Sequence, residues 1–197
     1  MSFEKFIQLT SGIVPLPVEN VDTDQIIPAR FLKAVNRAGF GDNLFRDWKY
    51  DKNGQPIKEF ILNDSQVKGQ ILVTGKNFGC GSSREHAAWA IYDYGFRVVI
   101  SSSFADIFKN NALNIGLLPI EISENFLEKI FDLWQVKKSM KLMVNLEEQF
   151  VGIIGTDEKE CFKISSYKKD CLLNGYDDID YLLSKKEEIE NFELNKS

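Results

Sequence analysis

A glycine-rich segment reads Gly75-Lys-Asn-Phe-Gly-Cys-Gly-Ser-Ser-Arg-Glu-His-Ala87. The apolar run at residues 70–74, directly before it, predicts a short buried strand. Because glycine has no Cβ, Gly75, Gly79 and Gly81 allow the backbone to adopt positive φ or to approach a ligand closely. The segment therefore predicts a strand that leads into a tight loop.

A helix is expected to begin directly after this loop. Ser82 and Glu85 fit the Ser-x-x-Glu capping box, and Gly95 is placed to end the helix. The N–H groups and the positive dipole end of such a helix favour an anion, and the planar guanidinium of Arg84 matches a carboxylate or phosphate. The pattern alone supports a purely structural turn equally well, with Ser82 as an ordinary cap.

Composition and motifs exclude several classes of protein. The 197 residues are 44% hydrophobic and 27% charged, which predicts a single globular domain over residues 1–197. The net charge of −5 argues against a nucleic-acid surface, and no apolar run approaches the roughly 20 residues of a membrane span. Arg84 stands where the dinucleotide fingerprint requires its third glycine, and no Walker A sequence is present.

The cysteines and the single histidine are informative about compartment and metal binding. Cys80, Cys161 and Cys171 form an odd set without framework spacing, which predicts reduced thiols and a cytoplasmic location. The N-terminus lacks the shape of a signal peptide. With His86 alone and no Cys-x-x-Cys pair, we expect no metal site in this chain.

The order of the predicted elements indicates a layered α/β fold. Strands and helices alternate in the middle of the chain, which favours a partly parallel sheet with flanking helices and right-handed crossovers. A meander of strands and a last helix follow. Strands are predicted at 6–14, 97–101, 117–122, 142–146, 150–154 and 161–164, and helices at 103–113, 123–135 and 177–191. Pro15 should end the first strand, Pro119 indicates an edge strand, and the last helix should bury its apolar residues.

A second polar segment, residues 20–30, reads Asn-Val-Asp-Thr-Asp-Gln-Ile-Ile-Pro-Ala-Arg. Asp22, Thr23 and Asp24 can cap backbone groups in a turn, which is the more common role of such residues. Two acids, a hydroxyl and an amide together can also form the wall of a polar site. Both interpretations remain open from the residues alone.

Residues 36–64 are the least regular part of the chain. Glycines and Pro56 alternate there with Phe40, Phe45, Trp48 and basic side chains. Such a loop is either functional or disordered, and the aromatic content argues against simple disorder. Composition slightly favours a loop held by packed rings over a mobile loop that takes part in function. Residues 192–197 are expected to form a disordered tail.

Several segments resemble one known family. Residues 79–87 resemble the Gly-Ser-Ser-Arg-Glu-His signature of the swivelling domain in the aconitase superfamily, and residues 20–30 are similar to the opening motif of 3-isopropylmalate dehydratase small subunits. Residues 102–111, 116–119 and 173–179 also resemble that family. The similarities occur in order from about residue 5 to 185, nearly the whole chain.

The resemblance implies a swivelling β/β/α domain that works with a partner. That partner is a large subunit carrying a [4Fe–4S] cluster, so no cofactor is expected in this chain. The implied reaction is the isomerisation of 2-isopropylmalate to 3-isopropylmalate by dehydration and rehydration, in leucine biosynthesis. The same hydro-lyase chemistry on citramalate, dimethylmalate or homoaconitate is an alternative. A further alternative is an anion-binding module that has the same fold but no catalytic activity.

The resemblance also implies roles for individual residues. Ser82 matches the catalytic base, and Asp24 matches an acidic residue that orients the site. Ser83 and Arg84 would hold a carboxylate of the 2-hydroxy diacid substrate, while His86 is expected to be structural.

The branched alkyl group of isopropylmalate needs an apolar wall. Phe40 and Leu44, which lie between glycine hinges, are predicted to supply it as parts of a closing lid. We expect this loop to be mobile in the isolated subunit and to become ordered over substrate in the complex. Arg37 at the base of this loop is expected to reach a substrate carboxylate.

Overall fold

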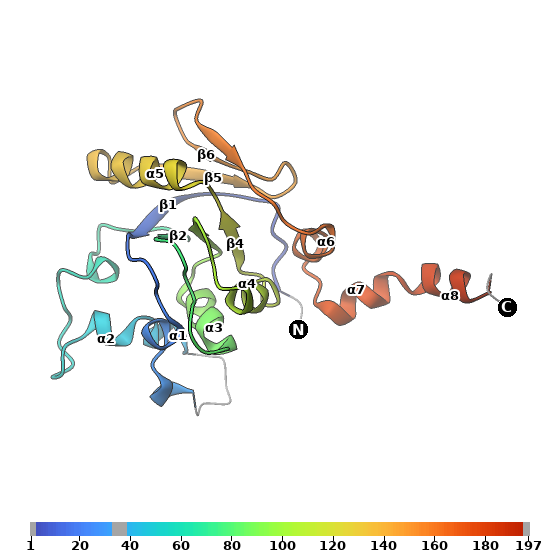
Figure 1. Ribbon diagram of the computed structural model, residues 1–197, viewed down its shortest axis with the longest axis horizontal. Helices are drawn as coiled ribbons and strands as arrows, with labels where there is room; N and C mark the ends of the chain where they lie inside the picture. The colour runs from blue at the N-terminus through green and yellow to red at the C-terminus, as the bar shows by residue number, and fades with distance from the viewer. Residues whose placement is uncertain (1–2, 33–38, 195–197) are drawn as a thin grey trace.

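The computed structural model describes residues 3–32 and 39–194, which fold around a seven-stranded sheet (Figure 1). The strand order is β4-β3-β2-β1-β5-β6-β7. Strands β4, β3, β2 and β1 pair in parallel. The pairs β1–β5, β5–β6 and β6–β7 are antiparallel. The strands are β1 (Gln8–Leu16), β2 (Ile71–Thr74), β3 (Val98–Ser101), β4 (Leu118–Glu121), β5 (Lys141–Asn145), β6 (Phe150–Ile153) and β7 (Lys159–Cys161).

Strand β1 joins the parallel and antiparallel halves of the sheet. Its first part, residues 8–12, pairs with β5, and its second part, residues 13–16, pairs with β2. The change of partner falls at Gly12, where a Cβ would lie 2.4 Å from the carbonyl oxygen of Lys68. Only glycine allows the chain before β2 to approach β1 this closely.

Two prolines lie inside strands of the sheet. Pro15 lies inside β1, opposite Val73, so the prediction that it ends the strand is wrong. Pro119 lies in β4, the edge strand of the parallel half, as the sequence predicts. Proline lacks a backbone N–H, so it is tolerated where that position of the strand has no partner to donate to.

The helices occupy both faces of the parallel strands. They are α1 (Thr23–Ile26), α2 (Arg46–Lys49), α3 (Glu85–Tyr94), α4 (Asp106–Leu113), α5 (Glu124–Val136), α6 (Ser166–Asn174), α7 (Asp178–Ser184) and α8 (Lys186–Leu194). Alternate residues of β2 point to opposite faces. Ile71 and Val73 pack in one core cluster with α5, and Leu72 packs in the other with α3 and α4.

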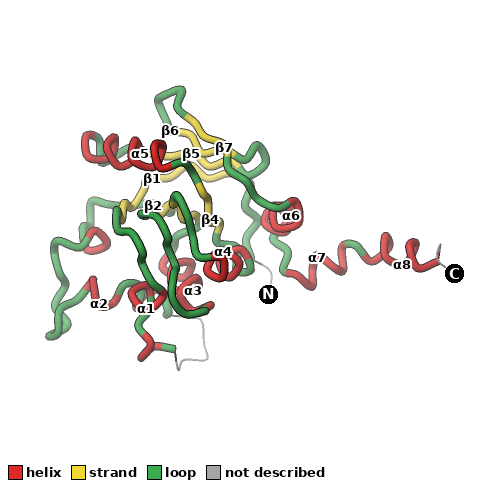
Figure 2. Tube along the Cα trace, viewed as in Figure 1, coloured by secondary structure: helices red, strands yellow, loops and turns green. Residues whose placement is uncertain are grey.

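The last third of the chain differs from its prediction in four respects. Helix α6 was not predicted at all, and α7 and α8 replace one continuous helix. The apolar residues of these two helices are exposed rather than buried. Helix α8 continues to Leu194, so residues 192–194 are helical rather than part of a disordered tail. Figure 2 shows α7 and α8 extending away from the rest of the domain.

The irregular segment after residue 38 is held by packed rings. It contains α2 and the short 3₁₀ turns Gly41–Asn43 and Ile61–Asn63. Phe45 is fully buried and stacks on Trp48 with ring centroids 5.2 Å apart, and Phe60 lies edge-on to both rings. This packing supports the interpretation that the aromatic residues fix the loop. Residues 36–38 lie outside the described ranges.

Candidate functional site

Two loops lie side by side where β1 and β2 end. The backbone N–H groups of Gly79 and Cys80 donate to the carbonyl oxygen of Val21, over 2.8 and 3.2 Å. The N–H of Thr23 donates in return to the carbonyl oxygen of Cys80, over 2.9 Å. Parallel strands place their carboxyl ends at one edge of the sheet, which is where ligands bind in α/β folds. The two segments with the strongest family resemblance therefore form a single surface.

The glycines of the second loop have the conformations that the sequence predicts. Gly79 has φ +77° and Gly81 has φ +88°, both in the region that favours glycine. A Cβ on Gly79 would lie 2.3 Å from Cγ of Phe108 in α4. The buried ring of Phe108 therefore restricts the path of the loop, because it leaves no room for a side chain at Gly79.

Ser82 and Ser83 follow this turn and are exposed. The predicted capping box is wrong, because α3 begins at Glu85 with Arg84 at the N-cap position and without a side-chain cap. The extended backbone of Arg84 delays the helix start, so Ser82 lies outside the first turn. The structure positions Ser82 through its backbone, since the hydroxyl of Thr23 donates to the carbonyl oxygen of Ser82 over 3.0 Å.

Arg84 and Asp24 form an ion pair between the two loops. Nη1 of Arg84 donates to Oδ1 of Asp24, and only 16% of the Arg84 side chain is exposed, against 52% for Asp24. The guanidinium has five N–H donors in a rigid fork, so this contact leaves donors for a second carboxylate. Ser82, Ser83 and Arg84 thus place two exposed hydroxyls and a mostly buried cation at consecutive positions of one loop.

The structure does not place the predicted apolar wall on this surface. Leu44 has no exposed area, and Phe40 is 3% exposed. The ring of Phe40 lies against α3, 5.4 Å from His86 and 5.9 Å from Trp89 between centroids. Both residues are part of a hydrophobic core cluster, so the expectation that they contact substrate does not hold in this structure. Arg37 lies outside the described residues.

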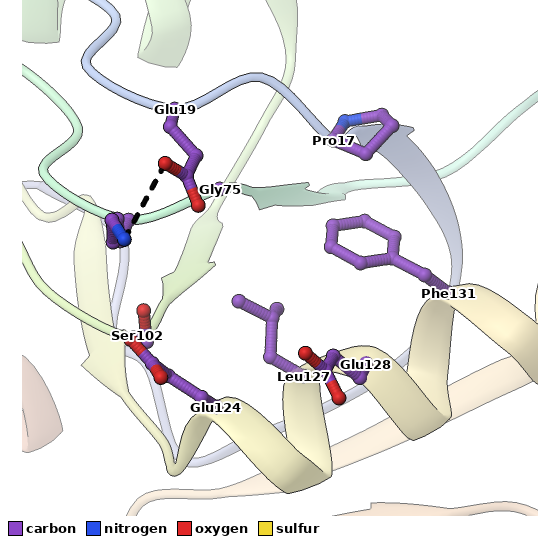
Figure 3. A pocket seen from close by; sticks show the side chains of 9 residues that line it. Pro17, Glu19, Gly75, Ser102, Glu124, Leu127, Glu128 and Phe131 are labelled. Carbon is purple, nitrogen blue, oxygen red and sulfur yellow. Dashed lines mark ion pairs between the residues drawn. The ribbon is translucent and has the colours of Figure 1, made fainter.

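A pocket of about 360 Å³ flanks the first residues of the glycine loop (Figure 3). Leu127 and Phe131 of α5 point into it, and Glu19 forms an ion pair with Lys76 across 3.5 Å. Its lining does not include Ser82 or Arg84. The pocket is therefore a neighbour of the candidate site, on the α5 side of the strand ends.

Two asparagines of the site were not singled out from the sequence. Asn20 and Asn77 join the two loops through their side-chain amides at 2.8 Å, next to Thr23, which is 2% exposed. Both asparagines have positive φ, at +54° and +56°. Asparagine tolerates this conformation better than most residues, so two asparagines flanking polar motifs could have served as a signal.

Within residues 3–32 and 39–194, no group of three or more His, Cys, Asp or Glu side chains could hold a metal ion. Cys80 lies on the glycine loop, Cys161 in β7 and Cys171 in α6, all as free thiols. In the same described ranges no helix has the length and apolarity needed to cross a membrane.

Comparison with known proteins agrees with this fold. The family model described as aconitase C-terminal domain matches residues 3–125, which include β1 to β4 and both site loops. A crystal structure of 3-isopropylmalate dehydratase from Methanocaldococcus jannaschii superposes with a TM-score of 0.67 at 26% sequence identity, over 95% of this chain and 99% of that one. The predicted swivelling-domain fold is confirmed.

Curated relatives are similar over nearly their whole length. The 3-isopropylmalate dehydratase small subunit of Cytophaga hutchinsonii is 60% identical over 96% of this chain and 94% of its own. That of Christiangramia forsetii is 60% identical over 98% and 94%, and that of Dinoroseobacter shibae is 46% identical over 98% and 96%. The chain belongs to the family of 3-isopropylmalate dehydratase small subunits.

Proposed function

We propose that this chain supplies half of the active site of a hydro-lyase that isomerises 2-isopropylmalate to 3-isopropylmalate in leucine biosynthesis. The other half comes from a large subunit that carries a [4Fe–4S] cluster. The observation that supports this most directly is the surface formed by Ser82, Ser83 and the Arg84–Asp24 ion pair. It has the hydroxyl and the cation that a reaction on a hydroxy diacid requires.

Dehydration removes a proton from a carbon next to a carboxylate, and rehydration returns a proton. Ser82 is the proposed base and acid for these transfers. A serine alkoxide is unfavourable near neutral pH, but the positive end of α3 and the Arg84 guanidinium stabilise negative charge at this position. Arg84 and Ser83 hold a substrate carboxylate, and Asp24 orients Arg84 through their ion pair.

The cofactor belongs to the partner in this proposal. The described residues of this chain do not form a ligand set for a metal, and its three cysteines lie on separate elements. The cluster supplies Lewis-acid assistance to departure of the hydroxyl group when it is bound in the large subunit. The free thiols also support a cytoplasmic location for the complex.

The test is reconstitution with the separately purified large subunit under anaerobic conditions. Isopropylmalate, citramalate and homocitrate are assayed side by side with wild type and with Ser82→Ala. We expect the highest kcat/KM on isopropylmalate and its loss in the variant. Preference for citramalate or homocitrate would reassign the substrate. A stable complex inactive on all three would favour an anion-binding module instead.

A further inference from the structure

The last two helices form an arm that carries an exposed apolar stripe. The arm, residues 178–194, comprises α7 and α8 and extends away from the domain (Figures 1 and 2). Ile179, Leu182 and Leu183 recur at the spacing of one helix face, and they are 68%, 60% and 64% exposed. Ile189 of α8 is 44% exposed. Surface helices normally turn such a face towards a core.

A different side of α7 attaches the arm to the domain. The carboxylate of Asp178 accepts hydrogen bonds from the Tyr167 hydroxyl, at 2.5 Å, and from Nζ of Lys168, at 2.8 Å. The ring of Tyr181 packs edge-on against Tyr167, with centroids 4.6 Å apart. Asp178 and Tyr181 are three residues apart and share this attached face. The contacts fix the base of the arm without covering Ile179 or Leu183.

The arm is strongly acidic. Residues 178–194 contain six acidic residues and two lysines, a net charge of −4, against −5 for all 197 residues. Two arms packed against each other would bring these acidic borders together, and like charges at an interface oppose association. The pattern of an apolar stripe with acidic borders instead fits an apolar groove bordered by lysine and arginine.

We propose that the arm is a docking element for the large subunit, and that the large subunit presents this basic-bordered apolar groove. The proposal rests on the proposed function, because that function requires a large-subunit partner. The arm is separate from the surface around Ser82, so it contributes to assembly and not to the reaction. It would give this subunit a second point of attachment outside the catalytic interface.

The test measures binding of the full-length chain to the purified large subunit by calorimetry. Ile179→Ser combined with Leu183→Ser replaces two exposed apolar side chains of the stripe with polar ones and does not change the core. We expect its Kd to rise by roughly tenfold or more, as for the loss of central apolar contacts. Val136→Ser, at an 88% exposed position in α5, is the matched control and should leave Kd unchanged. Glu187→Lys combined with Glu188→Lys should also weaken binding, because it reverses charge on the acidic border.

Two outcomes would overturn the proposal. One is an unchanged Kd in both arm variants. The other is self-association of the isolated chain that disappears on removal of the stripe, which would assign the arm to a second copy. The stripe variant should keep wild-type kcat once it saturates the large subunit. If the wild-type complex forms but turns over no hydroxy diacid, the proposed function fails, while the effect of the stripe on Kd still tests the docking role.

Discussion

The side-chain hydroxyl of Thr23 donates a hydrogen bond to the backbone carbonyl oxygen of Ser82 across 3.0 Å. Thr23 is 2% exposed and belongs to the first turn of α1, whereas Ser82 is exposed on the glycine loop. The bond joins two segments that are 59 residues apart in the chain. It fixes the serine backbone while leaving its side chain accessible to a substrate.

Thr23→Val should therefore lower kcat more than it raises KM. Valine has nearly the shape of threonine but cannot donate, so the Ser82 carbonyl loses its partner and the serine shifts. A small displacement of a catalytic group costs roughly 10- to 100-fold in rate, and loss of the bond costs about 1–3 kcal/mol of stability. Steady-state kinetics of the reconstituted complex provide the measurement. Thr23→Ser, which retains the hydroxyl, should restore kcat; failure to do so would assign the effect to packing.

Ser82→Ala should reduce kcat by roughly 10²–10⁴-fold, the range for loss of a general base or acid. Because Ser82 does not cap α3, the variant should not lose the roughly 1 kcal/mol that removal of an N-cap costs. Thermal unfolding of the isolated chain and kinetics of the complex are measured together. Near-normal turnover would remove Ser82 from the mechanism.

Arg84→Lys should raise KM, because lysine keeps the charge but loses the fork that holds a carboxylate and Asp24 together. Asp24→Asn should have a smaller effect in the same direction, since it removes the charge that orients the guanidinium. If the two residues act as one unit, the double variant will be no worse than Arg84→Lys alone. Additive losses would show that Asp24 acts independently of Arg84.

Leu44→Ala should destabilise the isolated chain by about 2–5 kcal/mol in urea unfolding, because it opens a cavity in a core cluster. Any effect on kcat/KM should then be equal for isopropylmalate and citramalate, and the same comparison applies to Phe40→Ala. A loss of kcat/KM that is larger on isopropylmalate, by on the order of 1–3 kcal/mol, would support the lid predicted from the sequence. Measurements with both substrates on both variants separate the two roles.

The attachment of the arm should weaken in acid. Two hydrogen bonds hold the pKa of Asp178 below its ordinary value of 3.8. The bond from Lys168 has the larger effect and the bond from Tyr167 the smaller. A lowered folded pKa gives stabilisation that is complete above the unfolded pKa and disappears as pH falls through the folded pKa. Amide exchange in α7 should therefore be slower in wild type than in Asp178→Asn at neutral pH. The difference should shrink as the pH falls below 3.8 and vanish once the Asp178 carboxylate is protonated. A difference that does not change with pH would show that it comes from the shape of the side chain and not from its charge.

Sequence patterns predicted the parallel half of the fold well, for identifiable reasons. Residues 70–74 form a buried apolar run with a glycine loop after it, and both features depend on local residue types. Helix α5 was predicted from its amphipathic spacing, and the structure adds that the hydroxyl of Ser123 caps it. The apolar residues of α7 have the same periodicity but no core to meet. Periodicity identifies a face, whereas tertiary structure determines whether anything covers it.

The members of the candidate site were proposed from a family resemblance, and the sequence did not predict their geometry. From the residue types alone, Ser82 and Asp24 fit a structural role equally well. Their arrangement depends on a pairing of loops through backbone hydrogen bonds, which residue types do not encode. Phe40 packs against α3, and both Phe40 and Leu44 belong to a core cluster, which the local pattern of glycines and apolar residues did not predict.

The divided pairing of β1 has a consequence for the order in which the chain can fold. Strand β1 is synthesised first. Its residues 8–12 have no partner strand until β5, which ends at residue 145, has been synthesised. Its second part pairs with β2 as soon as residues 71–74 emerge, and the two site loops can then meet. Because closing long loops is the slow step for non-local strand pairs, the edge that carries the candidate site can assemble early in synthesis. The antiparallel half completes the sheet only near the end.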